Sequence, residues 1–231
     1  MKTIGLIGGV SWESTAIYYN LINREVQKRQ GGLHSAKIAM ISVDFAELEE
    51  LVRTSQWDAL AGRLSDAAKN LERAGADMIL ICANTMHHEA DRVAKAIAVP
   101  LLHICDCTAR KIKAAGISRV ALLGTAYTME QDFYKDRLRA NDLDVIVPDA
   151  EDRAVIHRVI FEELVLGKVK AESRKAYREI IARQVDEGAE AIILGCTELP
   201  MLVKPEDSAV PLFDTTEIHA LAAVDFALAA S

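Results

Sequence analysis

The chain alternates short runs rich in Val, Ile and Leu with longer stretches in which apolar residues recur every three or four positions. The short runs have the length and composition of buried β-strands, and the longer stretches have the period of amphipathic helices. Strands and helices that alternate in this way are typical of parallel βαβ units, so the pattern predicts an α/β fold. The predicted strands cover residues 3–8, 36–44, 77–82, 99–103, 118–123, 143–147, 190–195 and 209–213.

Three segments of the first half return in the second half in the same order. The matching pairs are Ile4–Gly9 with Val120–Thr125, Gly75–Leu80 with Gly188–Ile193, and Val99–Leu101 with Val210–Leu212. Their offsets are 116, 113 and 111 residues, so the order is kept with only small deletions. Three matches in register predict two related halves, each a parallel sheet flanked by helices.

The repeat also predicts where the halves divide and where a ligand binds. We expect residues 1–98 together with 210–231 to form one half, and residues 99–209 to form the other. Ligands of open parallel sheets bind beyond the carboxyl ends of the strands. Two pseudo-symmetric halves that face each other would therefore place the active site in the cleft between them.

Composition and charge exclude several classes of partner. The 231 residues are 51% hydrophobic, enough for one large core or two small ones, and the net charge of −7 gives no general attraction to nucleic acid. The apolar runs are far shorter than the roughly 20 residues of a membrane helix. Met1 leads directly into a predicted strand, and the four cysteines do not form a disulfide pattern, so we expect a reduced, cytoplasmic protein.

A metal site is a weak alternative near the middle of the chain. Cys105 and Cys107 lie close to His103. Zinc sites usually need two residues between paired cysteines and a second pair elsewhere. The favoured interpretation is a strand end and helix start with small side chains, and no metal is expected.

Two cysteines lie at the ends of apolar runs, but the repeat does not match them to each other. An offset of 113 pairs Cys82 with Gly195 and Ala83 with Cys196. Successive side chains of a strand point to opposite faces, so Cys82 is expected to be a buried structural residue. The pseudo-symmetric equivalent of Cys196 is Ala83.

Cys196 is the better candidate for chemistry. It follows a strand and precedes Thr197-Glu198, so backbone N–H groups of the turn are expected to lower the pKa of its thiol. A thiolate near neutral pH can remove a proton or attack carbon. The alternative is that Cys196 is another small buried residue.

Short polar residues at other predicted strand ends indicate a carboxylate ligand. The Gly8–Ser11 turn suits an anion held by backbone N–H groups. It is not a dinucleotide fingerprint, and no acidic residue lies where one would bind a ribose. Each polar residue alone is typical of an ordinary turn, so the prediction rests on the convergence of Asn84, Thr85, Thr125 and Thr197.

Four ordered motifs carry a resemblance to a known family. They are Ile4–Thr15, Asn84–His87, Leu123–Thr125 and Gly195–Glu198. Together they resemble the aspartate/glutamate racemase family over essentially the whole chain, with the greatest similarity to the branch specific for aspartate and glutamate. The resemblance implies two pseudo-symmetric α/β domains, a homodimer and racemisation without a cofactor. One base takes the α-proton and an acid on the other face returns one, both commonly cysteines.

The resemblance also implies roles for single residues. Cys196 matches the second catalytic cysteine. The residues that match donors to the α-carboxylate are Asn84, Thr85 and Thr197, with Ser11 and Thr125 matching less closely.

Two basic residues match a receptor for the side-chain carboxylate of the substrate. Lys168 resembles a basic residue that has this role in some aspartate racemases, and Arg53 is a second candidate. Either residue can instead be an ordinary solvated charge.

The departure from the family lies at Ala83, where a cysteine, or in one atypical branch a threonine, is expected. Alanine neither takes nor gives a proton. The first interpretation is a racemase of aspartate or glutamate that is impaired or asymmetric, with water or a neighbouring group replacing the missing acid, or an engineered variant that traps ligand. The alternatives are a one-cysteine decarboxylase of the malonate type, in which Cys196 protonates a carbanion, and a catalytically silent dicarboxylate-binding protein.

Overall fold

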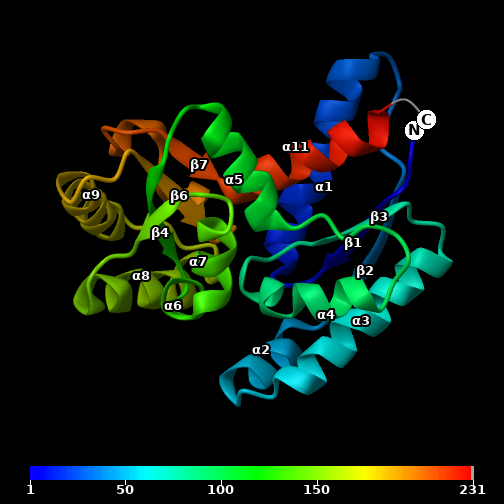
Figure 1. Ribbon diagram of the computed structural model, residues 1–231, viewed down its shortest axis with the longest axis horizontal. Helices are drawn as coiled ribbons and strands as arrows, with labels where there is room; N and C mark the ends of the chain where they lie inside the picture. Colours follow the sequence, from blue (N-terminus) through cyan, green and yellow to red (C-terminus); the bar gives the residue numbers. More distant parts are fainter. Residues whose placement is uncertain (230–231) are drawn as a thin grey trace. The chain divides into compact units, whose positions relative to one another are not determined.

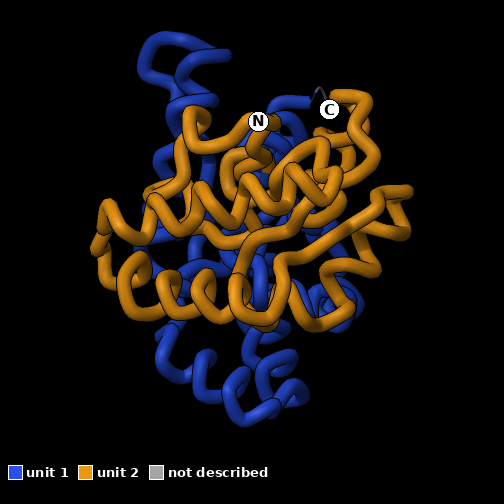
Figure 2. The backbone as a smooth tube through the Cα atoms, turned by 90° about the vertical axis from the view of Figure 1, so that its left-hand side faces the viewer, with its two compact units in different colours: residues 1–104, 219–231 blue, residues 105–218 orange. Residues whose placement is uncertain are grey.

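The computed structural model describes residues 1–229, which form two compact units. Unit 1 contains residues 1–104 and the residues from His219 onward, and unit 2 contains Cys105–Ile218 (Figure 2). Each unit is an α/β layer structure built on one parallel sheet. The predicted fold class, two parallel sheets flanked by helices, is therefore confirmed.

Unit 1 has a three-stranded sheet in the order β2-β1-β3 (Figure 1). Side chains of α1 and α11 pack on the face of the sheet formed by Ile4, Leu6 and Leu80. The helix α3 contacts all three strands. The end of α11 is tied to the first residues of the chain, because Lys2 N–H donates to Ala227 O at 3.0 Å. The elements are β1 (Ile4–Gly8), α1 (Trp12–Gln30), β2 (Ile38–Ser42), α2 (Phe45–Arg53), α3 (Trp57–Arg73), β3 (Met78–Ile81), η1 (Thr85–Glu89), α4 (Ala90–Lys95) and the larger part of α11 (Thr215–Leu228).

Unit 2 has a four-stranded parallel sheet in the order β5-β4-β6-β7. Helices α8 and α9 pack on one face through Ile156, Ile160 and Ile181. Helices α5 and α7 are joined by an ion pair of Arg137 with Asp106 at 2.7 Å. The elements are α5 (Ile104–Ala114), β4 (Arg119–Gly124), α6 (Ala126–Glu130), α7 (Asp132–Arg139), β5 (Asp144–Ile146), α8 (Ala150–Glu162), η2 (Leu164–Leu166), α9 (Ala171–Asp186), β6 (Ala191–Gly195), α10 (Leu199–Leu202), η3 (Pro205–Asp207) and β7 (Leu212–Asp214).

The internal repeat is visible in the hydrogen bonds of the two sheets. In unit 1, Ile79 N–H donates to Pro100 O at 2.9 Å, and in unit 2, Ile192 N–H donates to Pro211 O at 3.0 Å. Ile79 and Ile192 are separated by the offset of 113 residues that the sequence predicts. The same offset, carried to the end of each strand, pairs Ala83 with Cys196.

Two details differ from the expected organisation. Residues 99–103 do not form a strand, because Leu101 makes a single bridge to Ile79. That bridge keeps residues 99–104 with unit 1, whereas residues 210–218 belong to unit 2 because β7 pairs with β6. The boundaries therefore lie after Ile104 and Ile218 rather than after residues 98 and 209. Within residues 1–229, no helix has both the length and the apolar character needed to cross a bilayer.

Candidate active site

The first polar strand end in unit 1 is the turn after β1. Gly9 has a φ of 94°, and a Cβ there would lie 2.1 Å from Val43 O, so only glycine fits. Gly9 N–H donates to Thr15 Oγ1 at 2.8 Å, and that hydroxyl donates to Ser11 O at 2.9 Å. Ser11 caps α1 by accepting from Ser14 N–H at 3.3 Å. The turn therefore holds Ser11 Oγ at the electropositive end of a 19-residue helix.

The second strand end in unit 1 follows β3. Cys82 is completely buried in the core cluster that contains Leu80 and Ala223, and this burial raises the pKa of its thiol. The expected structural role of Cys82 agrees with this position. Ala83 and Asn84 follow it, 6% and 4% exposed, and Thr85 opens the 3-10 helix η1.

A buried histidine fixes the backbone at Ala83. His87 Nε2 accepts from Ile104 N–H at 3.3 Å, so in the neutral ring the proton lies on Nδ1. That Nδ1–H donates to Ala83 O at 2.7 Å. His87 thus connects the end of β3 to the residue at which unit 1 passes into unit 2.

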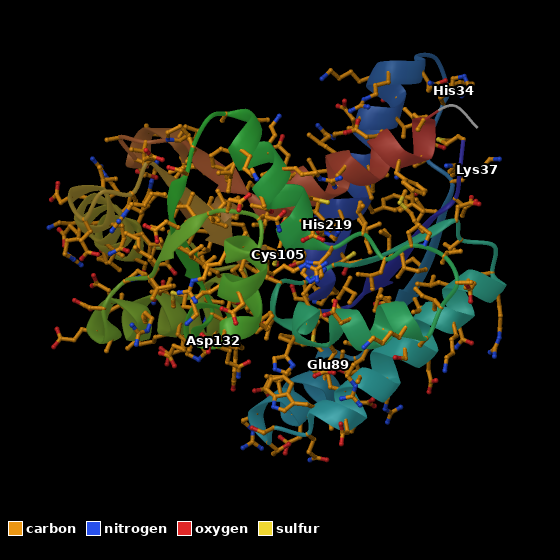
Figure 3. All side chains as sticks on the ribbon, in the orientation of Figure 1. His34, Lys37, Glu89, Cys105, Asp132 and His219 are labelled. Carbon is orange, nitrogen blue, oxygen red and sulfur yellow. The ribbon has the colours of Figure 1, made fainter. Side chains whose placement is uncertain are left out.

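A second buried imidazole lies beside His87. The ring of His219, which Figure 3 labels on α11, is 5.7 Å from that of His87 between centroids. Its Nε2 donates to Leu102 O at 2.8 Å, and its Nδ1 accepts from Tyr18 OH at 2.9 Å. Burial lowers the pKa of His219 to about 3, so this ring is neutral at pH 7.

The strand end in unit 2 that carries a thiol follows β6. Cys196 Sγ donates to Glu198 Oε2 at 3.0 Å, and Thr197 Oγ1 donates to the same oxygen at 2.7 Å. The three residues are 7%, 5% and 5% exposed. One buried carboxylate oxygen therefore accepts a hydrogen bond from both neighbouring side chains.

The environment of Cys196 favours its thiol form. Burial is the largest cause that raises the pKa of Cys196 well above its ordinary value, and the Glu198 carboxylate acts in the same direction by repelling a thiolate and accepting from the thiol. The backbone N–H groups of Thr197 and Glu198 do lower this pKa, as expected, but their effect is smaller. The predicted direction of the shift is therefore wrong, and Cys196 rests as a neutral thiol.

Thr125 lies at the end of the strand beside β6. Gly124 pairs with Gly195 across β4 and β6, and a Cβ on Gly124 would lie 2.8 Å from Gly195 O. Thr125 follows directly and caps α6 by accepting from Thr128 N–H at 3.3 Å. Thr125 and Cys196 therefore leave adjacent strands at the same level of the sheet.

Comparison with known proteins places the whole chain in one family. The family model for Asp/Glu/hydantoin racemases matches residues 7–223. The structure of a candidate Asp/Glu racemase from Yersinia pestis is 52% identical, covers 99% of this chain and 100% of that one, and superposes with a TM-score of 0.94. The structure of an aspartate racemase homologue from Pyrococcus horikoshii is 38% identical, covers 98% of this chain and 99% of that one, and has a TM-score of 0.85. The broad specificity amino-acid racemase RacX of Bacillus subtilis is 24% identical over 98% of both chains.

The chain belongs to the Asp/Glu/hydantoin racemase family. Membership of this racemase family supports amino-acid racemisation as the function. A related racemase acts on amino acids, which are small polar ligands. Sites for such ligands place a few polar groups together, and polar residues at strand ends are suited to this use.

The two basic residues that the racemase resemblance selected do not lie at strand ends. Arg53 is the last residue of α2, where its 58% exposed side chain forms an ion pair with Glu50. Lys168 is exposed in the connection between η2 and α9. Their assignment to the substrate therefore rests on the racemase resemblance.

The residues near the weak metal motif take structural positions. Cys105 and Cys107 lie in the first turn of α5 and are 0% and 3% exposed. Arg110 Nη2 donates to Cys107 Sγ at 3.4 Å. Among residues 1–229, no group of three or more His, Cys, Asp or Glu side chains is arranged to hold a metal ion.

Sequence reasoning missed three residues of this racemase fold that shape the strand ends. Glu198 and His87 lie inside motifs that were recognised, but nothing in the motifs shows that their side chains turn back to Cys196 and to Ala83 O. His157 of α8 accepts from Ala126 N–H at 3.1 Å and so holds the turn that follows Thr125. These contacts depend on rotamers and on packing between helices.

Proposed function

We propose that this protein is a cofactor-independent racemase of aspartate or glutamate in which Cys196 exchanges the α-proton and the opposite face, at Ala83, lacks an acid. The observation that carries the proposal is the buried Cys196–Glu198 pair at the end of β6 in a chain of a racemase family. The proposal requires that Ala83 and Cys196 act on opposite sides of one α-carbon.

Glu198 gives Cys196 a route to the reactive thiolate. The thiol proton moves from Sγ to Glu198 Oε2, across the 3.0 Å hydrogen bond, and leaves a thiolate beside a neutral carboxyl group. This transfer moves one charge within the pair and buries no additional charge. The thiolate then takes the α-proton, becomes a thiol again, and leaves the electron pair on the substrate as a carbanion.

The α-carboxylate would be bound by the polar strand ends. The candidates are Ser11, Asn84, Thr85, Thr125 and Thr197. Thr197 differs from the expected donor, because its hydroxyl already donates a hydrogen bond to Glu198 Oε2. Its backbone N–H, which also acts on the Cys196 thiol, is the other donor of this residue that could bind the substrate.

Lys168 is the better candidate for the side-chain carboxylate. Arg53 already has Glu50 as a partner, whereas Lys168 Nζ has no carboxylate within ion-pair distance among the described residues. An ammonium without a partner can bind a second carboxylate without first losing another. A homodimer remains part of the proposal and can be tested by sedimentation.

The Ala83 face sets the character of the reaction. The methyl group of Ala83, a residue that is 6% exposed, has no proton to return, so water or a neighbouring group must supply it. Loss of a positioned acid typically costs about 10²- to 10⁴-fold in rate. We therefore expect exchange of the α-proton at Cys196 to run ahead of racemisation.

The thiol form of Cys196 also favours a second candidate, a decarboxylase of the malonate type. That reaction breaks a carbon–carbon bond, releases carbon dioxide, and needs one acid to protonate the remaining carbanion. A resting thiol is already in the state that such an acid requires. Ala83 would then need no replacement.

The test is to incubate the enzyme with each enantiomer of aspartate and of glutamate in deuterated water, and to follow deuterium content and optical rotation separately. Racemase chemistry predicts deuterium uptake from one enantiomer that precedes inversion. Carbon dioxide release from a substituted malonate, without exchange of amino acids, would support the decarboxylase instead. Tight binding of dicarboxylates without either reaction would indicate a silent binding protein.

A further inference from the structure

The connection between α8 and α9 is folded around one buried carboxylate, that of Glu163. Its side chain is 4% exposed, and Oε2 accepts from Ser173 Oγ in the first turn of α9 at 2.6 Å. Oε1 lies 3.2 Å from Lys170 Nζ and 3.7 Å from Arg158 Nη1. The Ser173 hydrogen bond is the largest cause that lowers the pKa of Glu163, so this carboxylate is ionised at neutral pH.

The main chain of Glu163 organises the same connection. Its carbonyl oxygen accepts from Leu166 N–H at 3.0 Å and from Lys168 N–H at 2.9 Å. Gly167 between them has a φ of 70°, a left-handed conformation that glycine adopts without strain. Lys168 therefore leaves the turn from a backbone position that Glu163 holds directly.

One side of the turn packs toward the Cys196 strand end. Leu164 is 1% exposed and belongs to the same core cluster as Cys196 and Leu199. The short helix η2 contacts α10, which begins directly after Glu198. Leu164 and η2 therefore fix this side of the turn against the core of unit 2.

The other side of the turn is unusually apolar for an exposed surface. Leu166 and Val169 are 59% and 52% exposed, and they are the most exposed large apolar side chains of unit 2. Lys168 lies between them. The Glu163 carboxylate is the buried carboxylate nearest to Lys168 in the sequence. Its oxygens contact Ser173 and Lys170, and it forms no ion pair with Lys168.

We propose that Glu163 is a positioning residue that presents the Lys168 ammonium to the side-chain carboxylate of the substrate, and thereby sets the preference for dicarboxylic ligands. This inference rests on the proposed binding of aspartate or glutamate. A turn that is already fixed reduces the conformational entropy that Lys168 loses when the ligand binds. Glu163 therefore contributes to affinity without contacting the ligand. The α-carboxylate, bound elsewhere, should not depend on it.

The test compares succinate, which has two carboxylates, with butyrate, which has one, by calorimetry. Lys168→Met should weaken succinate at least tenfold and leave butyrate within twofold. Glu163→Gln and Ser173→Ala should each weaken succinate several-fold, again with butyrate unchanged. Lys175→Met is the matched control, because Lys175 is an 80% exposed lysine of α9 whose carboxylate neighbour is 3.9 Å away.

A double variant separates positioning from general damage. In the Lys168→Met background, Glu163→Gln should have no further effect on succinate, since the ammonium that it positions is gone. Hydrogen exchange should accelerate at the amides of residues 166 and 168 in Glu163→Gln. If Glu163→Gln does not fold, as judged by thermal melting, Ser173→Ala with and without Lys168→Met gives the same comparison.

Three results would overturn the inference. The first is an unchanged affinity for succinate in Lys168→Met. The second is a loss of butyrate affinity in Glu163→Gln and Ser173→Ala that equals their loss of succinate affinity. The third is a double variant in which the effects of Lys168→Met and Glu163→Gln on succinate affinity add in full. Failure of the proposed function gives a different pattern. If the proposed function is wrong, the wild-type protein will exchange no α-proton from aspartate or glutamate. The succinate affinities of wild type, the two single variants and the double variant would still show the coupling of Glu163 to Lys168.

Discussion

The ends of β3 and β6 occupy equivalent positions of the internal repeat but carry different chemistry. The offset of 113 residues pairs Ala83 with Cys196, Asn84 with Thr197, and Thr85 with Glu198. At β6 a thiol donates to a buried carboxylate two residues later, whereas at β3 the equivalent positions hold a methyl group and a hydroxyl. The comparison teaches that the repeat conserves strand register, while proton chemistry depends on a pair of residues that only one half contains.

The largest effect is expected from removing the thiol. Cys196→Ser should reduce α-proton exchange by about 10³-fold or more, because a hydroxyl is far less acidic than a thiol. Deuterium uptake by each aspartate enantiomer measures it. Cys82→Ala is the control, and it should lower the melting temperature while leaving turnover nearly unchanged, because Cys82 is buried in the core. Substantial exchange in Cys196→Ser would exclude Cys196 from the mechanism.

The next largest effect is expected from restoring the missing group. Ala83→Cys should raise racemisation relative to exchange by about 10²-fold, and Ala83→Thr should do so less. The new thiol would lack a carboxylate partner equivalent to Glu198, so the gain should stay below that of a complete thiol–carboxylate pair. Optical rotation measures inversion. Unchanged inversion in Ala83→Cys, together with its loss in Cys82→Ala, would show that the assigned register is wrong by one residue.

A smaller effect is expected from neutralising the partner of Cys196. Glu198→Gln should slow exchange at pH 7 by about 10- to 100-fold, since the thiol loses its proton acceptor. The carboxylate raises the pKa of Cys196, so the variant should form thiolate at lower pH than the wild type. The absorbance of the thiolate near 240 nm, corrected with Cys196→Ser, follows this titration. Glu172→Gln, an exposed carboxylate of α9, is the control, and identical titrations of Glu198→Gln and wild type would contradict the pairing.

The smallest expected effect on turnover, but a clear one on stability, concerns His219. Its pKa is about 3 in the folded protein and 6.5 ordinarily, so below pH 6.5 the unfolded state binds more protons than the folded state. Stability should therefore fall as the pH decreases from about 6.5 toward 3, by up to a few kcal/mol from this residue. The side chain in His219→Gln cannot titrate. The difference in the free energy of unfolding between wild type and His219→Gln, measured with urea, should therefore become smaller as the pH falls. A constant difference from pH 7.5 to 4.5 would refute this.

The fold was predictable because buried helices and strands leave recognisable patterns of apolar residues in the sequence. Strands such as Ala191–Gly195 are buried on both faces and therefore read as continuous apolar runs. The repeat was equally readable, because Val99-Pro100-Leu101 and Val210-Pro211-Leu212 are the same tripeptide. The two tripeptides differ in how far the following residues pair with the neighbouring strand. Leu101 makes a single bridge to β3, whereas Leu212 begins the strand β7, which pairs with β6.

The electrostatics of the candidate site were not predictable in the same way. The backbone N–H groups near Cys196 follow from its place after a strand, but the opposing carboxylate depends on the rotamer of Glu198. The contact of His219 with Leu102 joins residues 117 positions apart, and no local pattern encodes it. Lys168 was selected by resemblance alone, and its anchor at Glu163 became visible only in three dimensions.

The division of the chain has a consequence for synthesis on the ribosome. Unit 2 is one uninterrupted stretch, Cys105–Ile218, so all its strands are available before α11 is complete. Unit 1 must wait, because β1 is covered by α11 and Lys2 is bonded to Ala227 at the far end of the chain. The unit that carries Cys196 is therefore encoded in one continuous segment, whereas the unit that carries Ala83 can close only once α11 has been synthesised.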